Sequence, residues 1–316
     1  MALYPNTNTV IKFAHSDEGE DDILDTRPRC QREKEAYERL ATPDRPTTIL
    51  KYLGPSPDGR GILLEYAENG AVEKYLQRRK PLEEMSLRWS RQAAEALVFC
   101  HSRQVLHGDI RCGNLLLDQD FNSKLGDFTG SSIDQSEPLS YYDTGHLLPQ
   151  DDFAISVKTE IFAFGSMLFH IVSGSRPYHS LTSNEKAQKF RLQQFPGVTG
   201  YGFFGDIITK CWQLEYGTMA DVLKSLDAAG LHFSVAADSK TADSLKSVPV
   251  ADEQPSRWLF RFRSVRLSFT NSETNVWAWR GELIWSWLYL VRIGGMGCNT
   301  HMLTTLVAWS LYTGRP

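Results

Sequence analysis

Two short polar motifs in the middle of the chain constrain its fold and chemistry more than any other feature. The first is His-Gly-Asp-Ile-Arg-Cys-Gly-Asn over residues 107–114, and the second is Gly-Asp-Phe over residues 126–128. Asp127 of the second motif follows Asp109 of the first by eighteen residues. Short strand-like stretches surround both motifs, so we expect two carboxylates and an amide to lie on neighbouring loops.

This group of side chains is suited to phosphoryl transfer. Asp109 can accept a proton from an attacking hydroxyl, while the oxygen of Asn114 and the carboxylate of Asp127 can hold Mg²⁺ against phosphate groups. Mg²⁺ usually takes few carboxylates together with substrate phosphates, which fits this sparse ligand set. The alternative interpretation is that Asp109 and Asn114 are turn formers beside a strand. The spacing and the flanking strands together favour the catalytic interpretation.

The two motifs resemble those of the protein kinase family, whose catalytic loop reads H-R-D-x-x-x-x-N and whose metal-binding turn reads D-F-G. The resemblance implies that the chain uses ATP and Mg²⁺ and phosphorylates a protein substrate. It also implies that Asp109 is the catalytic base, that Asn114 binds one Mg²⁺ and that Asp127 is the chief Mg²⁺ ligand. Arg111 stands where serine/threonine kinases usually carry a lysine, although some tyrosine kinases place an arginine there. Serine/threonine is therefore the default acceptor class.

The resemblance extends toward the N-terminus. Val10-Ile11-Lys12 is similar to the kinase strand whose lysine contacts the α- and β-phosphates. Glu33 is the best candidate for the helix glutamate that pairs with this lysine, and Glu35 is the alternative, because only the helical register separates them. Taken alone, Lys12 would be an ordinary strand-edge lysine and Glu33 an ordinary solvated charge.

Leu64-Glu65-Tyr66-Ala67 resembles the kinase hinge. The resemblance implies that backbone groups of Glu65 and Ala67 hydrogen-bond adenine, that Leu64 is the gatekeeper and that Leu116 lies under the adenine ring. An apolar strand end and a core leucine would account for the same residues, so the hinge assignment depends on the catalytic loop.

Residue patterns predict strands at 9–14, 49–53 and 61–66, and helices at 27–40, 87–103, 160–172, 204–212 and 219–226. Strands with one helix come first and helices follow. With the resemblance, this order implies an α+β, two-lobed protein-kinase-like fold with a small, incomplete β-rich N-lobe at 1–67 and a helical C-lobe at 68–235. A linker at 236–255 and a tryptophan-rich tail at 256–316 follow.

The chain departs from the kinase pattern before its first lysine and inside both motifs. Only eleven residues precede Lys12, too few for a Gly-rich phosphate loop between two strands, so we expect the nucleotide site to lack that cover. Gly108 replaces the arginine that normally pairs with an activation-loop phosphate, which argues against control by that route. Thr129 follows Phe128, and it moves the glycine of D-F-G by one place.

Two further departures concern the scaffold. Gln150 stands in place of the glutamate of the kinase A-P-E motif, and Glu160 replaces the usual buried aspartate of the following helix. We expect these changes to weaken the support beneath the catalytic loop.

Two other functions stay open. A pseudokinase that acts as a binding or scaffold module would explain the missing phosphate loop, although Asp109 and Asp127 are both present. Small-molecule phosphotransferases of the aminoglycoside and choline kinase type carry an H-G-D-x-x-x-x-N loop like that of residues 107–114. The Asp127-Phe128 pair and the kinase-like stretch at 165–178 argue against that family.

Composition excludes several classes of protein. The 34 lysines and arginines are balanced by 38 acidic residues, and a formal charge of −4 gives no support to a nucleic-acid-binding surface. The five cysteines are scattered without a CxxC spacing, and residues 1–10 contain no apolar core of a signal peptide. We therefore expect an intracellular, cytoplasmic protein with reduced thiols.

The tail has an unusual composition. Six of the eight tryptophans lie within residues 258–309, and the stretch from residue 251 onward has seven arginines and no lysine. Arg292 interrupts the apolar run that could otherwise enter a membrane. Three interpretations stay open for the tail: a membrane or interfacial segment, a segment that docks on the kinase core, and translated sequence unrelated to the fold.

Overall fold

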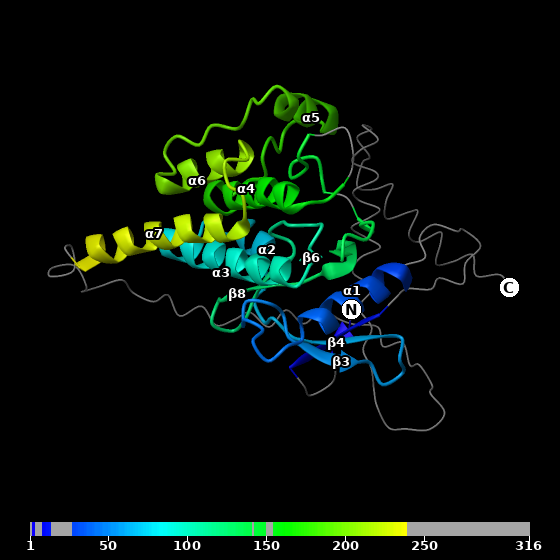
Figure 1. The fold of residues 1–316 in the computed structure, drawn as a ribbon. Coiled ribbons are helices and arrows are strands. Elements are labelled where there is room, and N and C mark those ends of the chain that lie inside the picture. Colours follow the sequence, from blue (N-terminus) through cyan, green and yellow to red (C-terminus); the bar gives the residue numbers. More distant parts are fainter. Residues whose placement is uncertain (1, 4–7, 14–26, 141, 150–153, 239–316) are drawn as a thin grey trace, which may run out of the picture.

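The computed structural model describes residues 2–3, 8–13, 27–140, 142–149 and 154–238. In these residues a small lobe built on an antiparallel sheet packs against a larger helical lobe, which confirms the predicted α+β class (Figure 1). The tryptophan-rich tail, most of the predicted linker and Gln150 lie outside the described residues. Within the described part, no helix has the length and apolar character needed to span a membrane.

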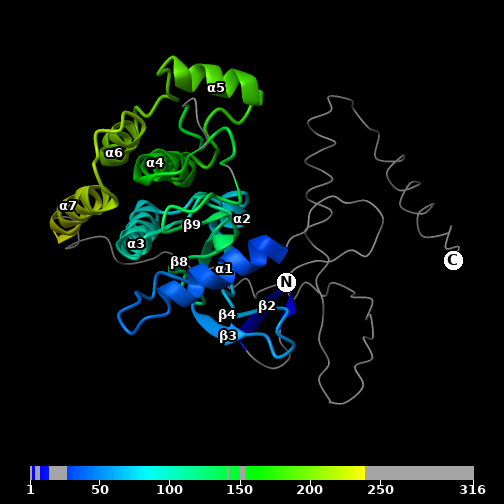
Figure 2. The same ribbon diagram turned by 45° about the vertical axis from the view of Figure 1, so that its right-hand side comes forward.

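The small lobe is a four-stranded antiparallel sheet with strand order β1-β2-β4-β3. Its strands are β1 (Ala2–Leu3), β2 (Thr9–Phe13), β3 (Tyr52–Pro55) and β4 (Gly61–Glu65). β1 therefore pairs with the outer edge of the strand that carries Lys12, where the sequence predicts too little room for two strands. Helix α1 (Arg27–Leu40) lies between this sheet and the helical lobe (Figure 2).

One predicted strand lies at a different place. The strand expected at 49–53 begins only at Tyr52. Ile49 instead forms a parallel bridge to Leu125, and the N–H of Leu50 donates to the carbonyl of Leu125 at 2.9 Å. Ile49 and Leu50 are both buried. The apolar run thus fills the junction between the lobes, where burial competes with sheet pairing for the same apolar residues.

The helical lobe is centred on helix α4, in which every residue from Thr159 to Val172 is buried, including the polar Glu160, Ser166 and His170. A capping box between Ser156 and Thr159 begins this helix, and Gly174 at φ 79° ends it. The helices of this lobe are α2 (Val72–Leu76), α3 (Glu83–Ser102), α4 (Val157–Ser173), α5 (Ser183–Arg191), α6 (Phe203–Trp212) and α7 (Met219–Asp238). Helix α7 runs past the boundary predicted at residue 235.

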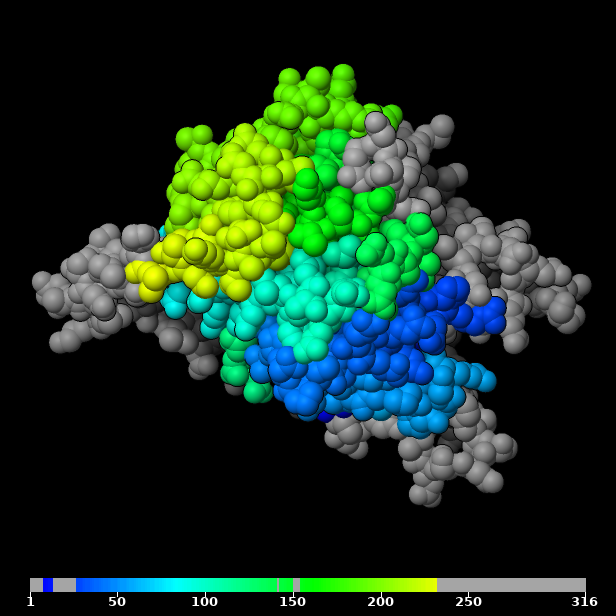
Figure 3. Space-filling model, in the orientation of Figure 1, coloured from blue at the N-terminus to red at the C-terminus, as the bar shows by residue number. Residues whose placement is uncertain are grey.

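Short strands between the lobes hold the two polar motifs. β5 (Gly70–Ala71), β7 (Leu115–Leu117) and β8 (Ser123–Leu125) form one sheet, and β6 (Val105–Leu106) pairs with β9 (Ser132–Ile133). The 3₁₀ turn η1 (Phe128–Gly130) follows β8. In the space-filling view the blue residues of the small lobe lie directly against the cyan and green residues of the helical lobe (Figure 3).

Candidate active site

Lys12 connects three elements of the site. Its ammonium nitrogen lies 2.8 Å from Oε2 of Glu33 on α1 and 2.8 Å from Oδ1 of Asp127, which precedes η1. Lys12 and Glu33 are almost completely buried. Burial alone would lower the pKa of Lys12, but the charges of Asp127 and Glu33 raise it above its usual value. Burial raises the pKa of Glu33 to about 7, against the opposing effect of Lys12.

The helical register decides between the two candidate glutamates. Glu33 shares the buried face of α1 with Ala36, Tyr37 and Leu40, at the spacing of one helical stripe. Glu35 is exposed, and its carboxylate accepts a hydrogen bond of 2.8 Å from Gln31. Glu33 is therefore the residue that the fold brings to Lys12.

Asp127 has a left-handed backbone conformation, with φ 63° and ψ 69°. Non-glycine residues adopt this region rarely, and such strain is concentrated at functional sites. The hydroxyl of Thr129 donates to Oδ1 of Asp127 at 2.8 Å. Burial would raise the pKa of Asp127, but the nearby Lys12 ammonium and the hydrogen bonds from Lys12 and Thr129 hold it well below its usual range.

The threonine that displaces the glycine after Phe128 thus adds a second contact to Asp127 within this turn. In the sequence, Thr129 is only a departure from the D-F-G pattern, yet its side chain orients the carboxylate of Asp127. Phe128 is fully buried. The centroid of its ring lies 5.0 Å from the ring centroid of Tyr37 and 4.8 Å from that of His107. The turn is therefore held from both lobes.

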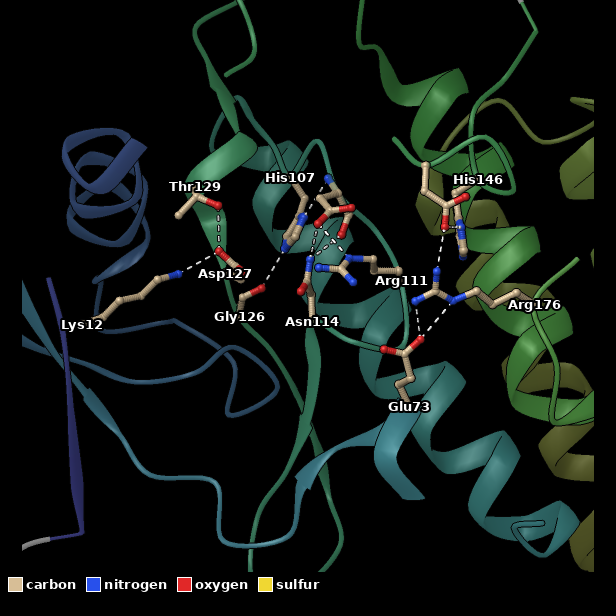
Figure 4. Close-up of polar contacts among 12 residues, drawn as sticks. Lys12, Glu73, His107, Arg111, Asn114, Gly126, Asp127, Thr129, His146 and Arg176 are labelled. Carbon is tan, nitrogen blue, oxygen red and sulfur yellow. Dashed lines mark hydrogen bonds and ion pairs between the residues drawn. The ribbon is translucent and has the colours of Figure 1, made fainter. Parts of the chain in front are cut away.

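His107, Arg111 and Asn114 of the catalytic-loop motif lie close together (Figure 4), and all three contact Asp109. Oδ2 of Asp109 accepts hydrogen bonds from Nε of Arg111 at 2.9 Å and from Nδ2 of Asn114 at 2.8 Å. Buried His107 accepts the N–H of Asp109 at Nδ1 and lies 2.9 Å from the carbonyl of Gly126 through Nε2. Because the carbonyl can only accept, His107 carries its proton on Nε2 and connects the two motifs.

Gly108 is required by the backbone at its position. Its φ is 77°, and a Cβ there would lie 2.5 Å from the carbonyl oxygen of Gly130. Any side chain at position 108 would therefore meet both backbone strain and a steric clash with the metal-binding turn.

Glu160 supports the catalytic loop, so the expectation that this residue weakens the support beneath the loop is wrong. Its Oε1 accepts the backbone N–H of Gly108 at 2.9 Å and the hydroxyl of Tyr142 at 3.2 Å, and its Oε2 lies 2.6 Å from Nε2 of His101. Burial opposes its ionisation, but His101 and the other hydrogen-bond donors hold the pKa of Glu160 below its usual value. The longer side chain thus supports the catalytic loop directly.

Asn114 and Asp127 fit the Mg²⁺ that the motifs imply. Nδ2 of Asn114 donates to Asp109, which turns the amide oxygen away from that residue. Oδ1 of Asp127 accepts hydrogen bonds from both Lys12 and Thr129, so Oδ2 is the oxygen available to a cation. Among the described residues, no cluster of three or more His, Cys, Asp or Glu forms a complete metal site. Two protein oxygens would suit a cation that takes its other ligands from phosphates and water.

The hinge-like segment runs from β4 into β5. Leu64 and Ala67 are buried, and the Glu65 side chain accepts hydrogen bonds from Lys124 at 3.0 Å and from the N–H of Lys51 at 2.7 Å. β5 pairs with β7, where Leu116 lies opposite Ala71. The fold thus joins the proposed hinge to the strand that carries Leu116.

Comparisons with known proteins agree with this geometry. A family model for the protein kinase domain matches residues 9–201. The chain is 30% identical over 161 residues to a probable L-type lectin-domain containing receptor kinase of Arabidopsis thaliana, in a match that covers 44% of this chain and 24% of the relative. It is 26% identical over 181 residues to a cell cycle serine/threonine-protein kinase of Saccharomyces cerevisiae, covering 54% of this chain and 25% of the relative.

A third relative is a probable serine/threonine-protein kinase of Dictyostelium discoideum, 31% identical over 138 residues, with 42% of this chain and 27% of the relative covered. The chain matches about a quarter of the length of each of these curated relatives.

Proposed function

Because the chain belongs to the protein kinase family, we propose that it transfers the γ-phosphoryl group of ATP to a hydroxyl group of a protein substrate. The observation that carries this proposal is the position of Lys12, whose ammonium lies 2.8 Å from both Glu33 and Asp127. This arrangement would present one cation to the phosphates and one carboxylate to a metal.

Each polar residue then has a defined task. Lys12, fixed by Glu33, orients the α- and β-phosphates of ATP. Asn114 and Asp127 would hold Mg²⁺, which when bound neutralises phosphate charge. Arg111 and Asn114 occupy Oδ2 of Asp109, so the acceptor hydroxyl would bind at Oδ1 and pass its proton there. Leu64, Leu116 and the backbone groups of Glu65 and Ala67 would enclose the adenine.

We propose serine and threonine as the acceptor residues. Two of the three relatives named above are serine/threonine-protein kinases by name. An intracellular location is part of the proposal, because ATP is an intracellular substrate and Cys100, Cys112 and Cys211 are buried free thiols.

The test is transfer of labelled γ-phosphate from ATP to a generic protein acceptor by the full chain. Asp109→Asn should lower the rate by about 10²–10⁴-fold, because it removes the group that accepts the hydroxyl proton. Asp120→Asn is the matched control, since Asp120 is an exposed carboxylate beyond the loop, and it should leave the rate unchanged. Mg²⁺-dependent ATP binding without transfer to any protein would instead identify a binding module. Transfer to free hydroxylated metabolites alone would identify a small-molecule phosphotransferase.

A further inference from the structure

Arg176, in the connection between α4 and α5, joins two segments that are distant in sequence. Its Nε and terminal nitrogen lie 3.0 and 2.5 Å from Oε1 of Glu73, which belongs to α2. Its other terminal nitrogen donates to Oδ2 of Asp143 at 3.1 Å, in the segment between η1 and α4. One guanidinium group thus bridges two carboxylates, with its charge divided between them.

Asp143 organises the turn that follows it. Its Oδ1 accepts the N–H of Gly145 at 2.6 Å, and its carbonyl oxygen accepts the N–H of His146 at 2.7 Å. The buried ring of His146 lies with Nδ1 3.5 Å from Oδ2 of the same carboxylate. The carboxylate that Arg176 holds is therefore also the group that fixes the path of residues 143–146.

Burial and charge favour an ionised network. Burial would raise the pKa of both carboxylates. Arg176 holds the pKa of Glu73 below its usual value, and His146, the N–H of Gly145 and Arg176 together hold that of Asp143 below its usual range. About two thirds or more of each side chain in the Arg176 pairs is shielded from solvent. Ion pairs in such positions are screened less than pairs at the open surface.

Glu73 connects this network to the catalytic loop. Its backbone N–H donates to the carbonyl of Cys112 at 3.1 Å. Its side chain lies close to Gly113, where an added Cβ would be 3.3 Å from Oε2 of Glu73 and 2.9 Å from a terminal nitrogen of Arg111. Gly113 therefore lies between the carboxylate of Glu73, which belongs to the Arg176 network, and the guanidinium of Arg111, which pairs with Asp109.

The network lies on the side of the catalytic loop opposite Lys12 and Asp127. In Figure 4, Lys12 and Asp127 are on one side of Asn114 and Arg111, and Glu73, Arg176 and His146 are on the other. A protein acceptor must reach Asp109 from the side that Lys12 does not occupy. An acceptor that approaches from this side would meet the segment that Arg176 anchors.

We propose that Arg176 is a positioning residue for the protein acceptor: it fixes residues 143–149 against the catalytic loop through Asp143 and Glu73. This inference rests on the proposed protein kinase function. It predicts that loss of Arg176 weakens acceptor binding while ATP binding is kept, because the ion pairs of Lys12 belong to a separate network.

The first measurement is steady-state kinetics of the full chain with Arg176→Gln. We expect the KM for the protein acceptor to rise about tenfold or more, because misplacement by about 1 Å is enough for such losses, while the KM for ATP stays unchanged. Arg176→Lys should recover only part of the loss, since an ammonium group cannot present the planar fork that bridges both carboxylates. Arg91→Gln is the matched control, because Arg91 pairs with Asp227 at 2.5 Å on the surface between α3 and α7.

The second measurement does not need turnover. Amide hydrogen exchange in residues 142–149 should become faster in Arg176→Gln and in Asp143→Asn, and the double variant should exchange no faster than either single variant. Unchanged exchange in Arg176→Gln would overturn the inference, whether or not the protein is active. An unchanged acceptor KM in an active enzyme would also overturn it. Failure of the wild-type chain to phosphorylate any protein would reject the proposed function, and exchange would still decide whether Arg176 anchors this segment.

Discussion

The ammonium nitrogen of Lys12 lies 2.8 Å from Oε2 of Glu33, although a sheet strand carries one residue and helix α1 the other. The same nitrogen lies 2.8 Å from Oδ1 of Asp127. The contact therefore fixes the position of α1 relative to the metal-binding turn, and with it the geometry of the proposed phosphate site.

Replacing Glu33 by glutamine should weaken binding of Mg²⁺-ATP. A hydrogen bond to a charged group contributes about 1.5–3 kcal/mol, so we expect a loss of roughly 10- to 150-fold in affinity, measured by calorimetric titration. Glu35→Gln on the exposed face of the same helix should bind ATP like the wild type. Equal losses in the two variants would show that the Lys12 contact does not matter.

A methyl group at position 108 should destabilise the protein. Gly108→Ala adds backbone strain at φ 77° and a clash of 2.5 Å with the carbonyl of Gly130, and we expect the free energy of unfolding to fall by about 2–4 kcal/mol in chemical denaturation. Gly59→Ala is the control, because Gly59 has φ 71° but open space around it. Its cost should be about 1 kcal/mol. Similar costs at the two positions would rule out the close contact with Gly130.

Shortening the buried carboxylate beneath the catalytic loop should also be costly. Glu160→Asp withdraws the oxygens from Gly108 and His101, and we expect a loss of about 3 kcal/mol in unfolding free energy together with lower phosphotransfer. Glu95→Gln, at an exposed position on α3, should change neither quantity. Full activity and stability of Glu160→Asp would mean that the aspartate typical of kinases fits here equally well.

The contribution of His170 to stability should fall between pH 6.5 and 4, while the raised pKa of Glu33 contributes in the opposite direction over much of this range. Burial lowers the pKa of this residue to about 4 from an ordinary value of 6.5. The folded state therefore binds fewer protons than the unfolded state in this range, so the contribution is complete above pH 6.5 and is lost as the pH falls through 4. The difference is on the order of 3 kcal/mol.

Thermal or chemical unfolding at several pH values checks this expectation. His170→Gln should remove this contribution, so that stability falls less, or rises more, as the pH is lowered from 6.5 to 4 than in the wild type, while His179→Gln, at an exposed position, should leave the pH dependence unchanged. The same slope in His170→Gln as in the wild type would contradict the assignment.

The family and the two-lobed α+β fold could be predicted from the sequence, because the polar motifs and the hydrophobic periodicities are local patterns. The apolar residues Ile49 and Leu50 could not be placed so well, since a short apolar run fits a strand and an interlobe core equally. The supporting role of Glu160 depends on how far a buried side chain reaches, and that is settled only by the packing around it.

No pattern in the sequence indicates that Arg176 pairs with Glu73 and Asp143. Glu73, Asp143 and Arg176 lie far apart along the chain, and each is an ordinary charged residue by itself. Only the tertiary fold brings the three together. Thr129 is an intermediate case, because its place in the motif is visible in the sequence but its hydrogen bond to Asp127 is not.

The most direct test of the central claim is the thermal stability of the full chain titrated with ATP, with and without Mg²⁺, beside the Asp127→Asn variant. A ligand at 100 times its Kd stabilises the protein that binds it by about 2.7 kcal/mol, which is a readily measured shift in Tm. We predict a Mg²⁺-dependent increase in the wild type that disappears in Asp127→Asn. An equal increase in both proteins, or none in either, would contradict a nucleotide site built on Lys12, Glu33 and Asp127.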